Sequence, residues 1–282
     1  MSGGRRDFLK GMGLAAAAAT LGGCRCACAG GGKRLCALQL YSIHKIFWKE
    51  PERMLAALKA GGYDGVEFYN YNGMSAKALR KMCDDAGVKA MGTHLNGDVD
   101  LVDDGLKRTL DYAAEAGFES LVTPHAKRDS ADAYRKFGHA MGLAAEAADA
   151  YGIKVGVHST YHHFTTVYGG ETAWDMIYKE ASPKLYQQID TANTFHTGYD
   201  VVGLLKRYPN RHFSIHMKEN VPTVDGVFGV PPTDGGKCVP WSELVSYMKT
   251  ERALRWWIVE AEGHPDSLDP ALKCASIMRR WI

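Results

Sequence analysis

The stretch AGGYDGVEF at residues 60–68 contains the unit from which most of the chain is built. A helical pattern ends at glycine, and an apolar strand pattern begins almost at once. The same transition recurs as AGVKAMG at 86–92, AGFESLV at 116–122 and YGIKVGV at 151–157. Glycine is favoured after a helix because it adopts the left-handed backbone conformation that ends one. Repeated helix–glycine–strand transitions with short connections predict βα units and a parallel sheet.

Working outward from this unit, we expect eight strands and eight helices. The strands are predicted to begin near Leu35, Gly65, Val88, Ser120, Ile153, Leu185, His212 and Arg255. The helices are predicted near 50–60, 75–86, 101–117, 131–150, 171–181, 199–208, 241–251 and 267–281. Eight such units in about 250 residues predict a single α/β domain, a closed (β/α)8 barrel over 33–282. A doubly wound open sheet is the alternative, but no G-x-G-x-x-G follows the first strand.

Length and charge limit the class of protein. The chain has 282 residues, of which 46% are hydrophobic and 23% charged, and its formal net charge is +2. These are ordinary values for a globular protein. Neither the charge nor any long basic run indicates a nucleic-acid partner, which argues against an endonuclease. The longest connection, 218–240, is rich in glycine and proline, and connections of this length are usually functional.

The first 32 residues have the composition of an export signal rather than of a folded element. Arg5 and Arg6 are followed by Phe-Leu-Lys and then by a small-residue apolar stretch at 11–23, the pattern of a twin-arginine leader. LGGC at 21–24 resembles a lipoprotein cleavage box, which would leave Cys24 lipidated. ACA at 27–29 is a competing cleavage site. We therefore expect a periplasmic or cell-envelope protein, either lipid-anchored or freed by cleavage.

The cysteines beyond this leader match no zinc-binding spacing. They are Cys36, Cys83, Cys238 and Cys274. Four cysteines permit three pairings, and the spacing does not choose among them or against all of them. Cys36 falls in an apolar strand and Cys274 in a helix, so we expect buried free thiols at these two positions.

Histidines and acids gather where the predicted strands end. These residues are Glu67, His94, His125, His158, Asp190, His216 and Glu260. In a (β/α)8 barrel the functional groups project from the carboxyl ends of the strands. Alternation along a strand places His158 with Gly156, opposite two valines, and places His216 with Lys218, opposite Phe213 and Ile215. The apolar faces suit the surrounding helices, so the polar groups should point into the mouth of the barrel.

Four of these residues, on four consecutive strands, form a predicted metal site: His158, Asp190, His216 and Glu260. Two imidazoles and two carboxylates suit Mn, Co, Zn or Fe. Mg and Ca prefer shells of oxygen atoms and are less favoured. The adjacent Trp256–Trp257 pair is expected to be packing rather than a sugar platform.

Five short motifs resemble one known family. They are LQLYS at 38–42, GYDGVE at 62–67, IDTAN at 189–193, HMKE at 216–219 and VE at 259–260. Together these strand motifs resemble those of the sugar phosphate isomerase/epimerase family, the xylose isomerase-like TIM barrels. The resemblance covers roughly residues 35–282. It implies a sugar enzyme whose divalent cation is held from strands five to eight.

The family as a whole includes ketose epimerases, inosose dehydratases and isomerases, and lyases of 3-keto-glycosides. Its epimerases usually have glutamate where this chain has His158. The resemblance therefore does not imply a symmetrical two-glutamate epimerase here. The reaction type that the resemblance still implies is proton abstraction next to a carbonyl. With one strong base, isomerisation or β-elimination is the expected outcome. A sugar-binding lipoprotein without catalysis is the alternative from another class.

The resemblance and the strand-end positions together suggest roles for individual residues. Glu260 or His94 is the expected base, Lys218 would polarise a sugar oxygen, and Glu67 would help to shuttle a proton. The expected substrate contacts are His125, Asn193 and His196. Because sugar phosphates are mainly cytoplasmic and no glycine-rich phosphate loop is present, an unphosphorylated keto-sugar or oxidised glycoside is the expected substrate.

Overall fold

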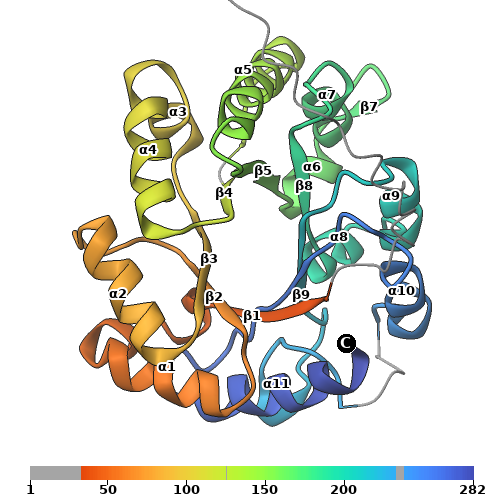
Figure 1. Cartoon of the computed structure of the whole chain (residues 1–282). Helices are drawn as coiled ribbons and strands as arrows, with labels where there is room; N and C mark the ends of the chain where they lie inside the picture. The colour runs from red at the N-terminus through yellow and green to blue at the C-terminus, as the bar shows by residue number, and fades with distance from the viewer. Residues whose placement is uncertain (1–32, 125, 233–237) are drawn as a thin grey trace, which may run out of the picture. The chain divides into compact units, whose positions relative to one another are not determined.

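The computed structural model describes residues 33–124, 126–232 and 238–282, and eight of its strands close into a parallel barrel in the order β1-β10-β9-β8-β5-β4-β3-β2 (Figure 1). The barrel strands are β1 Leu35–Gln39, β2 Gly65–Phe68, β3 Lys89–His94, β4 Ser120–Thr123, β5 Lys154–His158, β8 Tyr186–Asp190, β9 Ser214–Met217 and β10 Trp256–Val259. The predicted (β/α)8 barrel is confirmed, and the open-sheet alternative is wrong.

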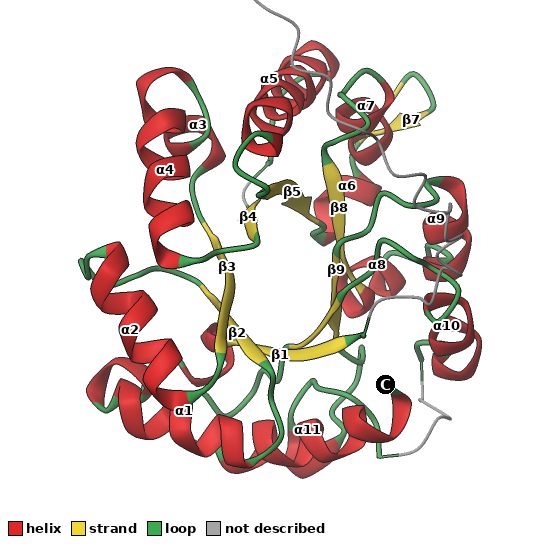
Figure 2. Cartoon of the chain, in the orientation of Figure 1, coloured by secondary structure: helices red, strands yellow, loops and turns green. Residues whose placement is uncertain are grey.

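The principal helices surround the strands, as Figure 2 shows. They are α1 Pro51–Ala60, α2 Ala76–Ala86, α4 Asp103–Ala116, α5 Ala131–Asp149, α7 Ala173–Lys179, α9 Val201–Arg207, α10 Trp241–Met248 and α11 Asp269–Trp281. Gly87 and Gly117 end α2 and α4 with φ angles of 69° and 77°, the left-handed cap that the sequence predicted. Buried apolar residues of these helices form one cluster with apolar residues of the strands, so the core lies between the helices and the barrel.

Short elements that the sequence pattern did not reveal lie in the loops after the strands. They are α3 Gly97–Asp100, α6 Tyr161–Thr165, the hairpin β6 Val167–Tyr168 with β7 Glu171–Thr172, and α8 Thr191–His196. Each is too short to show a helical or strand period. Three 3-10 helices, Leu40–Ile43, Phe47–Lys49 and Val224–Gly226, also follow strands. These segments build the rim of the barrel mouth.

The lower interior of the barrel is an apolar layer that we call the floor. It consists of Leu35, Ala37, Met91, Trp256 and Ile258, with Phe213 packed against it. A Cβ atom on Gly65 would lie 2.8 Å from the Trp256 ring, so glycine is required there for the indole to fit. Trp257, one residue on, packs among the helices instead. Both indoles are buried, as expected for packing residues.

The predictions about the cysteines, the export signal and His125 can be compared with the residues that the structure describes. The cysteines Cys36, Cys83, Cys238 and Cys274 are free, and Cys36 and Cys274 are buried thiols as predicted. No helix among the described residues is both long enough and apolar enough to cross a membrane. The predicted export signal at 1–32 and the predicted substrate contact His125 lie outside the described residues.

Candidate metal centre

The four predicted ligands converge at the barrel mouth. His158 ends β5, Asp190 ends β8, His216 lies in β9, and Glu260 follows β10 directly. Each offers one nitrogen or oxygen atom, and these atoms lie within 4.8 Å of one another. All four side chains are buried. The parallel strands bring together residues that are far apart in sequence, because their carboxyl ends meet at one face of the barrel.

The ring of His158 is oriented by Gln188, two residues before Asp190 on β8. Gln188 Nε2 donates to Glu67 Oε1 at 2.7 Å, and a carboxylate oxygen can only accept, so Gln188 Oε1 must face the histidines. His158 Nδ1 lies 2.9 Å from that oxygen and donates to it. Nε2 then has the lone pair and faces Asp190 Oδ2 at 3.8 Å. His158 is thus held in the tautomer that would ligate a cation through Nε2.

His216 lies between two carboxylates. Its Nε2 is 2.7 Å from Glu67 Oε2, and its Nδ1 is 2.6 Å from Glu260 Oε2. Although burial opposes a charged ring, Glu67 and Glu260 raise the pKa of His216 to about 10. The imidazolium therefore donates to both acids at neutral pH. A cation ligated by Nδ1 would displace the proton between Nδ1 and Glu260. The proton on Nε2 would stay in its hydrogen bond to Glu67, which is the usual carboxylate–histidine–metal arrangement.

Lys218 supplies positive charge among the carboxylates of the mouth. Its Nζ lies 3.0 Å from Asp190 Oδ2, 3.6 Å from Glu260 Oε1 and 3.4 Å from Glu262 Oε2. Burial opposes ionisation of Glu260, but the charge of Lys218 and the hydrogen bond from His216 hold the pKa of Glu260 well below its usual range. The site therefore concentrates negative charge that already attracts one cationic group, which is the environment that a metal ion requires.

Glu67 lies beneath the mouth rather than on its surface. Its side chain is 0% exposed, and it accepts hydrogen bonds from Gln39 Nε2 and Gln188 Nε2, each at 2.7 Å, as well as from His216. Burial disfavours the anion, but His94 and His216 hold the pKa of Glu67 well below its usual range. An acid so enclosed is placed to orient His216. Because it is fully buried, its predicted part in a proton shuttle would pass through His94, whose Nε2 lies 3.2 Å from Glu67 Oε2.

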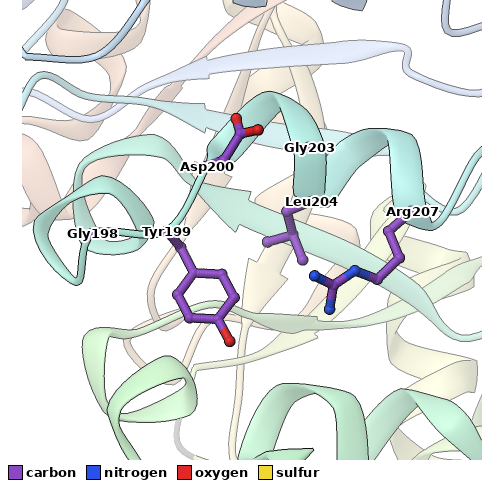
Figure 3. A pocket seen from close by; sticks show the side chains of 6 residues that line it. All are labelled: Gly198, Tyr199, Asp200, Gly203, Leu204 and Arg207. Carbon is purple, nitrogen blue, oxygen red and sulfur yellow. The ribbon is translucent and has the colours of Figure 1, made fainter.

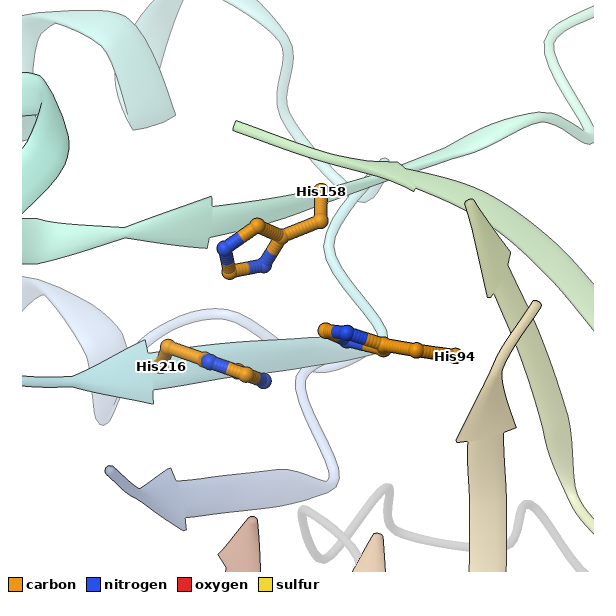
Figure 4. A group of neighbouring side chains, drawn as sticks. All are labelled: His94, His158 and His216. Carbon is orange, nitrogen blue, oxygen red and sulfur yellow. The ribbon is translucent and has the colours of Figure 1, made fainter. Parts of the chain in front are cut away.

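Among the three clustered imidazoles His94, His158 and His216, His94 has the most solvent exposure. Its side chain is 13% exposed, its ring stacks on His216 at 5.4 Å, and Figure 4 shows it facing the rings of His158 and His216. Nε2 lies 2.9 Å from Gln188 Oε1 and therefore donates to it. In the neutral ring Nδ1 is then the proton acceptor. This geometry suits the base that the sequence analysis predicted.

The predicted substrate contacts have different environments. Asn193 is half-buried, and its backbone N–H and side-chain amide both donate to Asp190, at 2.8 and 3.0 Å. It therefore holds the candidate ligand Asp190 at the start of α8. His196 lies exposed in the last turn of α8. The roles of Asn193 and His196 as substrate contacts stay predictions.

Sequence reasoning missed three residues that matter to the site. Gln39 and Gln188 orient Glu67 and the histidines, and Glu262 lies at the rim with its side chain 42% exposed. Burial and the negative charge of Glu260 raise the pKa of Glu262 to about 7. Strand alternation could have found them, because Gln188 shares a face with Asp190, and Glu262 comes two residues after Glu260.

The described surface has a cavity beside the site and another away from it. One, of about 600 Å³, adjoins the candidate metal cluster through His94. It is lined by Tyr69, Asn70, Tyr71, Asn72, Gly73, His94 and Asp100. The other, of about 330 Å³, is formed by residues 198–207 around α9 and contains none of the cluster residues (Figure 3). The chemistry of the mouth therefore connects with the first cavity.

An eight-stranded parallel barrel with histidines and carboxylates at the carboxyl ends of its strands is a TIM barrel with its functional groups on the usual face. The chain belongs to the family of xylose isomerase-like TIM barrels, which it matches over residues 55–281. The resemblance inferred from the strand motifs is confirmed.

The chain is also similar to several individual proteins. An inosose dehydratase from Bacillus licheniformis is 25% identical over 154 residues, and the match spans 49% of each chain. A sugar phosphate isomerase/epimerase from Parabacteroides distasonis has a structure with a TM-score of 0.74 at 20% identity, covering 90% of this chain and 97% of the other. A D-allulose 3-epimerase from Methylomonas, solved with D-allulose, has a TM-score of 0.63 at 13% identity, covering 89% and 98%. These structural likenesses show the shared fold.

Proposed function

We propose that this chain is a divalent-metal-dependent enzyme that removes a proton next to the carbonyl group of a keto-sugar. The observation that carries the proposal is the geometry of His158 and His216. Each ring has one nitrogen bonded to an acceptor below the site and presents the other toward Asp190 or Glu260. Two such imidazoles with two buried carboxylates fit Mn, Co, Zn or Fe better than Mg.

When bound, the cation would act as a Lewis acid for the carbonyl oxygen that becomes negative as the neighbouring carbon loses its proton. The protein residues perform the remaining tasks. Glu67 and Gln188 hold the two imidazoles in the ligating tautomer. Lys218, whose Nζ contacts three carboxylates, would balance their charge and donate to a sugar oxygen at the rim.

His94 is the base in this proposal, because its Nδ1 is the acceptor of the neutral ring and its side chain lines the open cavity. Glu262 is the second acid–base group. Its pKa of about 7, raised by burial and by Glu260, makes it available as an acid or a base near neutral pH. Glu67 is excluded from direct transfer by its complete burial.

This arrangement of His94 and Glu262 as the acid–base groups favours isomerisation or β-elimination over clean inversion at one carbon. A two-base epimerase uses a strong base on each face of the sugar, and this chain has His158 in place of one of those carboxylates. A proton taken by His94 could return to the neighbouring carbon, or the electron pair could expel a leaving group that Glu262 protonates. A lyase reaction on a 3-keto-glycoside is thus the second candidate.

The test combines metal analysis with isotope exchange. The purified protein should contain a transition metal and should incorporate solvent deuterium at carbon in a panel of ketoses and 3-keto-glycosides. Asp190→Asn keeps the oxygen that caps α8 but removes a ligand charge, so it should lose metal and exchange by about 100-fold or more. Asp149→Asn, on the exposed end of α5, is the matched control.

Metal occupancy of the wild-type level in Asp190→Asn would remove this residue from the site. Rapid epimerisation at a single carbon, with neither aglycone release nor aldose–ketose interconversion, would overturn the proposed reaction type. A protein that binds sugars in the same panel without metal or exchange would instead be a sugar-binding protein.

The leader sequence supports a proposal about location. Arg5 and Arg6, followed by the apolar stretch at 11–23, would direct export of the folded protein, with Cys24 as the residue lipidated after cleavage. Replacing both arginines by lysine should retain the precursor in the cytoplasm. Unchanged delivery of that variant to the cell envelope would contradict the twin-arginine interpretation.

A further inference from the structure

The cavity of about 600 Å³ beside His94 has no part in the reaction as described so far, apart from His94 itself. Six of its seven lining residues lie outside the metal cluster. Its volume is within the range of about 300–1,000 Å³ that is typical of small-molecule sites. Since the reacting carbons must lie near the cluster, anything that fills this cavity must extend beyond them.

The walls of the cavity are aromatic rings held in place by neighbouring groups. Tyr71 stacks on Tyr112 with ring centroids 4.5 Å apart, and Tyr112 donates to the backbone oxygen of Met74 at 2.9 Å. Tyr69 meets the ring of Tyr41 edge-on at 5.6 Å. Tyr41 is 46% exposed, so this aromatic surface continues onto the rim. Rings that are already fixed lose little entropy when a ligand stacks on them.

The polar groups of the cavity are mainly neutral. Asn70 and Asn72 lie in the turn at its edge, where Asn72 has a φ angle of 49° and donates its backbone N–H to Asn70 Oδ1 at 3.1 Å. Asp100 is the carboxylate among the seven lining residues and His94 the imidazole, and none of the seven is lysine or arginine. An anionic group such as a phosphate would meet a carboxylate here with no basic partner.

We propose that this cavity, which we call the extension subsite, binds a neutral ring attached to the reacting sugar. The natural substrate is then a keto-glycoside with an aromatic aglycone or a second sugar, rather than a free monosaccharide or a sugar phosphate. Aromatic faces and side-chain amides are the groups that recognise such rings, through stacking and hydrogen bonds. This inference rests on the proposed function, because it takes the metal cluster as the place of reaction.

Equilibrium binding separates the subsite from the chemistry. Phenyl β-D-glucopyranoside and methyl β-D-glucopyranoside differ only in the attached group, and both would be titrated into the Mn-loaded protein. The wild type should bind the phenyl compound about fivefold more tightly or better, the size expected of one aromatic contact. Tyr69→Leu should bring the ratio close to one while leaving the affinity for the methyl compound and for Mn unchanged.

Two further variants make the test specific. Asn72→Gly keeps the left-handed turn, because glycine adopts that conformation freely, and removes only the amide. It should reduce phenyl-glucoside affinity less than Tyr69→Leu does. Tyr151→Leu, 40% exposed and just before the amino end of β5, should leave both affinities unchanged.

The two proposals can fail separately. Equal affinity for both glucosides in the wild type, or an equal loss of both in Tyr69→Leu, would overturn the extension subsite. Deuterium exchange into free keto-sugars would still support the proposed function in that case. A phenyl preference that depends on Tyr69 without any exchange would support the subsite and count against the proposed reaction.

Discussion

The mouth and the floor of the barrel are built from the same strands, but their inward-facing side chains have opposite chemistry. On β10, Trp256 and Ile258 belong to the apolar floor, and Glu260 directly beyond the strand belongs to the charged mouth. On β2, Gly65 makes room for Trp256, while Glu67, two residues later, orients His216. Along a single strand, the inward-facing side chains therefore change from apolar packing residues to charged residues of the candidate site. Stability and function are separated along the barrel axis.

A half-buried acid, Glu119, lies beside the floor, and its contacts differ from those of the mouth. Glu119 accepts hydrogen bonds from Arg255 Nε at 2.8 Å and from the Trp256 indole at 2.9 Å. This carboxylate is paired with a permanent cation and a packing residue. Glu67 is paired with imidazoles, whose charge changes with protonation or metal binding. The same residue type thus pairs with packing groups at one end of the barrel and with groups of the candidate site at the other.

The largest effect should come from breaking the floor. Trp256→Ala removes a fully buried indole and should lower the free energy of unfolding by about 3–5 kcal/mol. Urea unfolding would measure this loss, and metal affinity of the folded variant should stay at the wild-type value. Tyr161→Ala, 59% exposed at the rim, should change stability by less than about 0.5 kcal/mol. Equal losses in the two variants would contradict the division between floor and mouth.

A smaller effect, on metal affinity, should distinguish the acid Glu67 near the mouth of the barrel from the acid Glu119 beside its floor. Glu67→Gln places an amide among groups that all donate, so His216 should lose its orientation and metal affinity should fall about 10- to 100-fold. Glu119→Gln is the matched control, and it should alter unfolding in urea without altering metal affinity. Competition with a coloured chelator would measure both affinities. Similar metal affinity in Glu67→Gln and the wild type would make Glu67 a packing residue.

The smallest effect concerns pH and the floor-side His212. Burial lowers the pKa of His212, and neither ring nitrogen has a hydrogen-bond partner in the described structure. The folded state therefore favours the neutral ring, and its stabilising effect is present above the unfolded pKa of about 6.5 and lost as pH falls toward the folded pKa. Unfolding at pH 7.5 and 5 should show a weaker pH dependence in His212→Gln, by at most about 1.4 kcal/mol per pH unit.

His139→Gln, on the exposed face of α5, should keep the pH dependence of the wild type. Comparing each variant with the wild type removes the contribution of the other histidines. A steeper loss of stability at low pH in His212→Gln would mean that Glu251, 3.9 Å away, stabilises the charged ring instead.

The fold was predictable because its signals are local and repeated. Glycines such as Gly87 and Gly117 mark helix ends wherever they occur, and β-strand alternation shows which side chains share a face. The ligand cluster was predictable for the same reason, since a closed barrel brings the carboxyl ends of its strands together. The short elements α6 and α8 were not predictable, because five or six residues show no period.

The sequence alone determined the barrel, the inward faces of its strands, and the meeting of His158, Asp190, His216 and Glu260 at one end. These follow from backbone geometry, which is the same in every strand. Only the tertiary structure decided that Glu67 is enclosed, that Gln188 orients two imidazoles, and that a cavity opens beside His94. These features depend on how deep each side chain lies in the barrel and on its partners from other strands. The depth of a side chain is set by strand register and by the bulk of opposing side chains, which no local sequence pattern records.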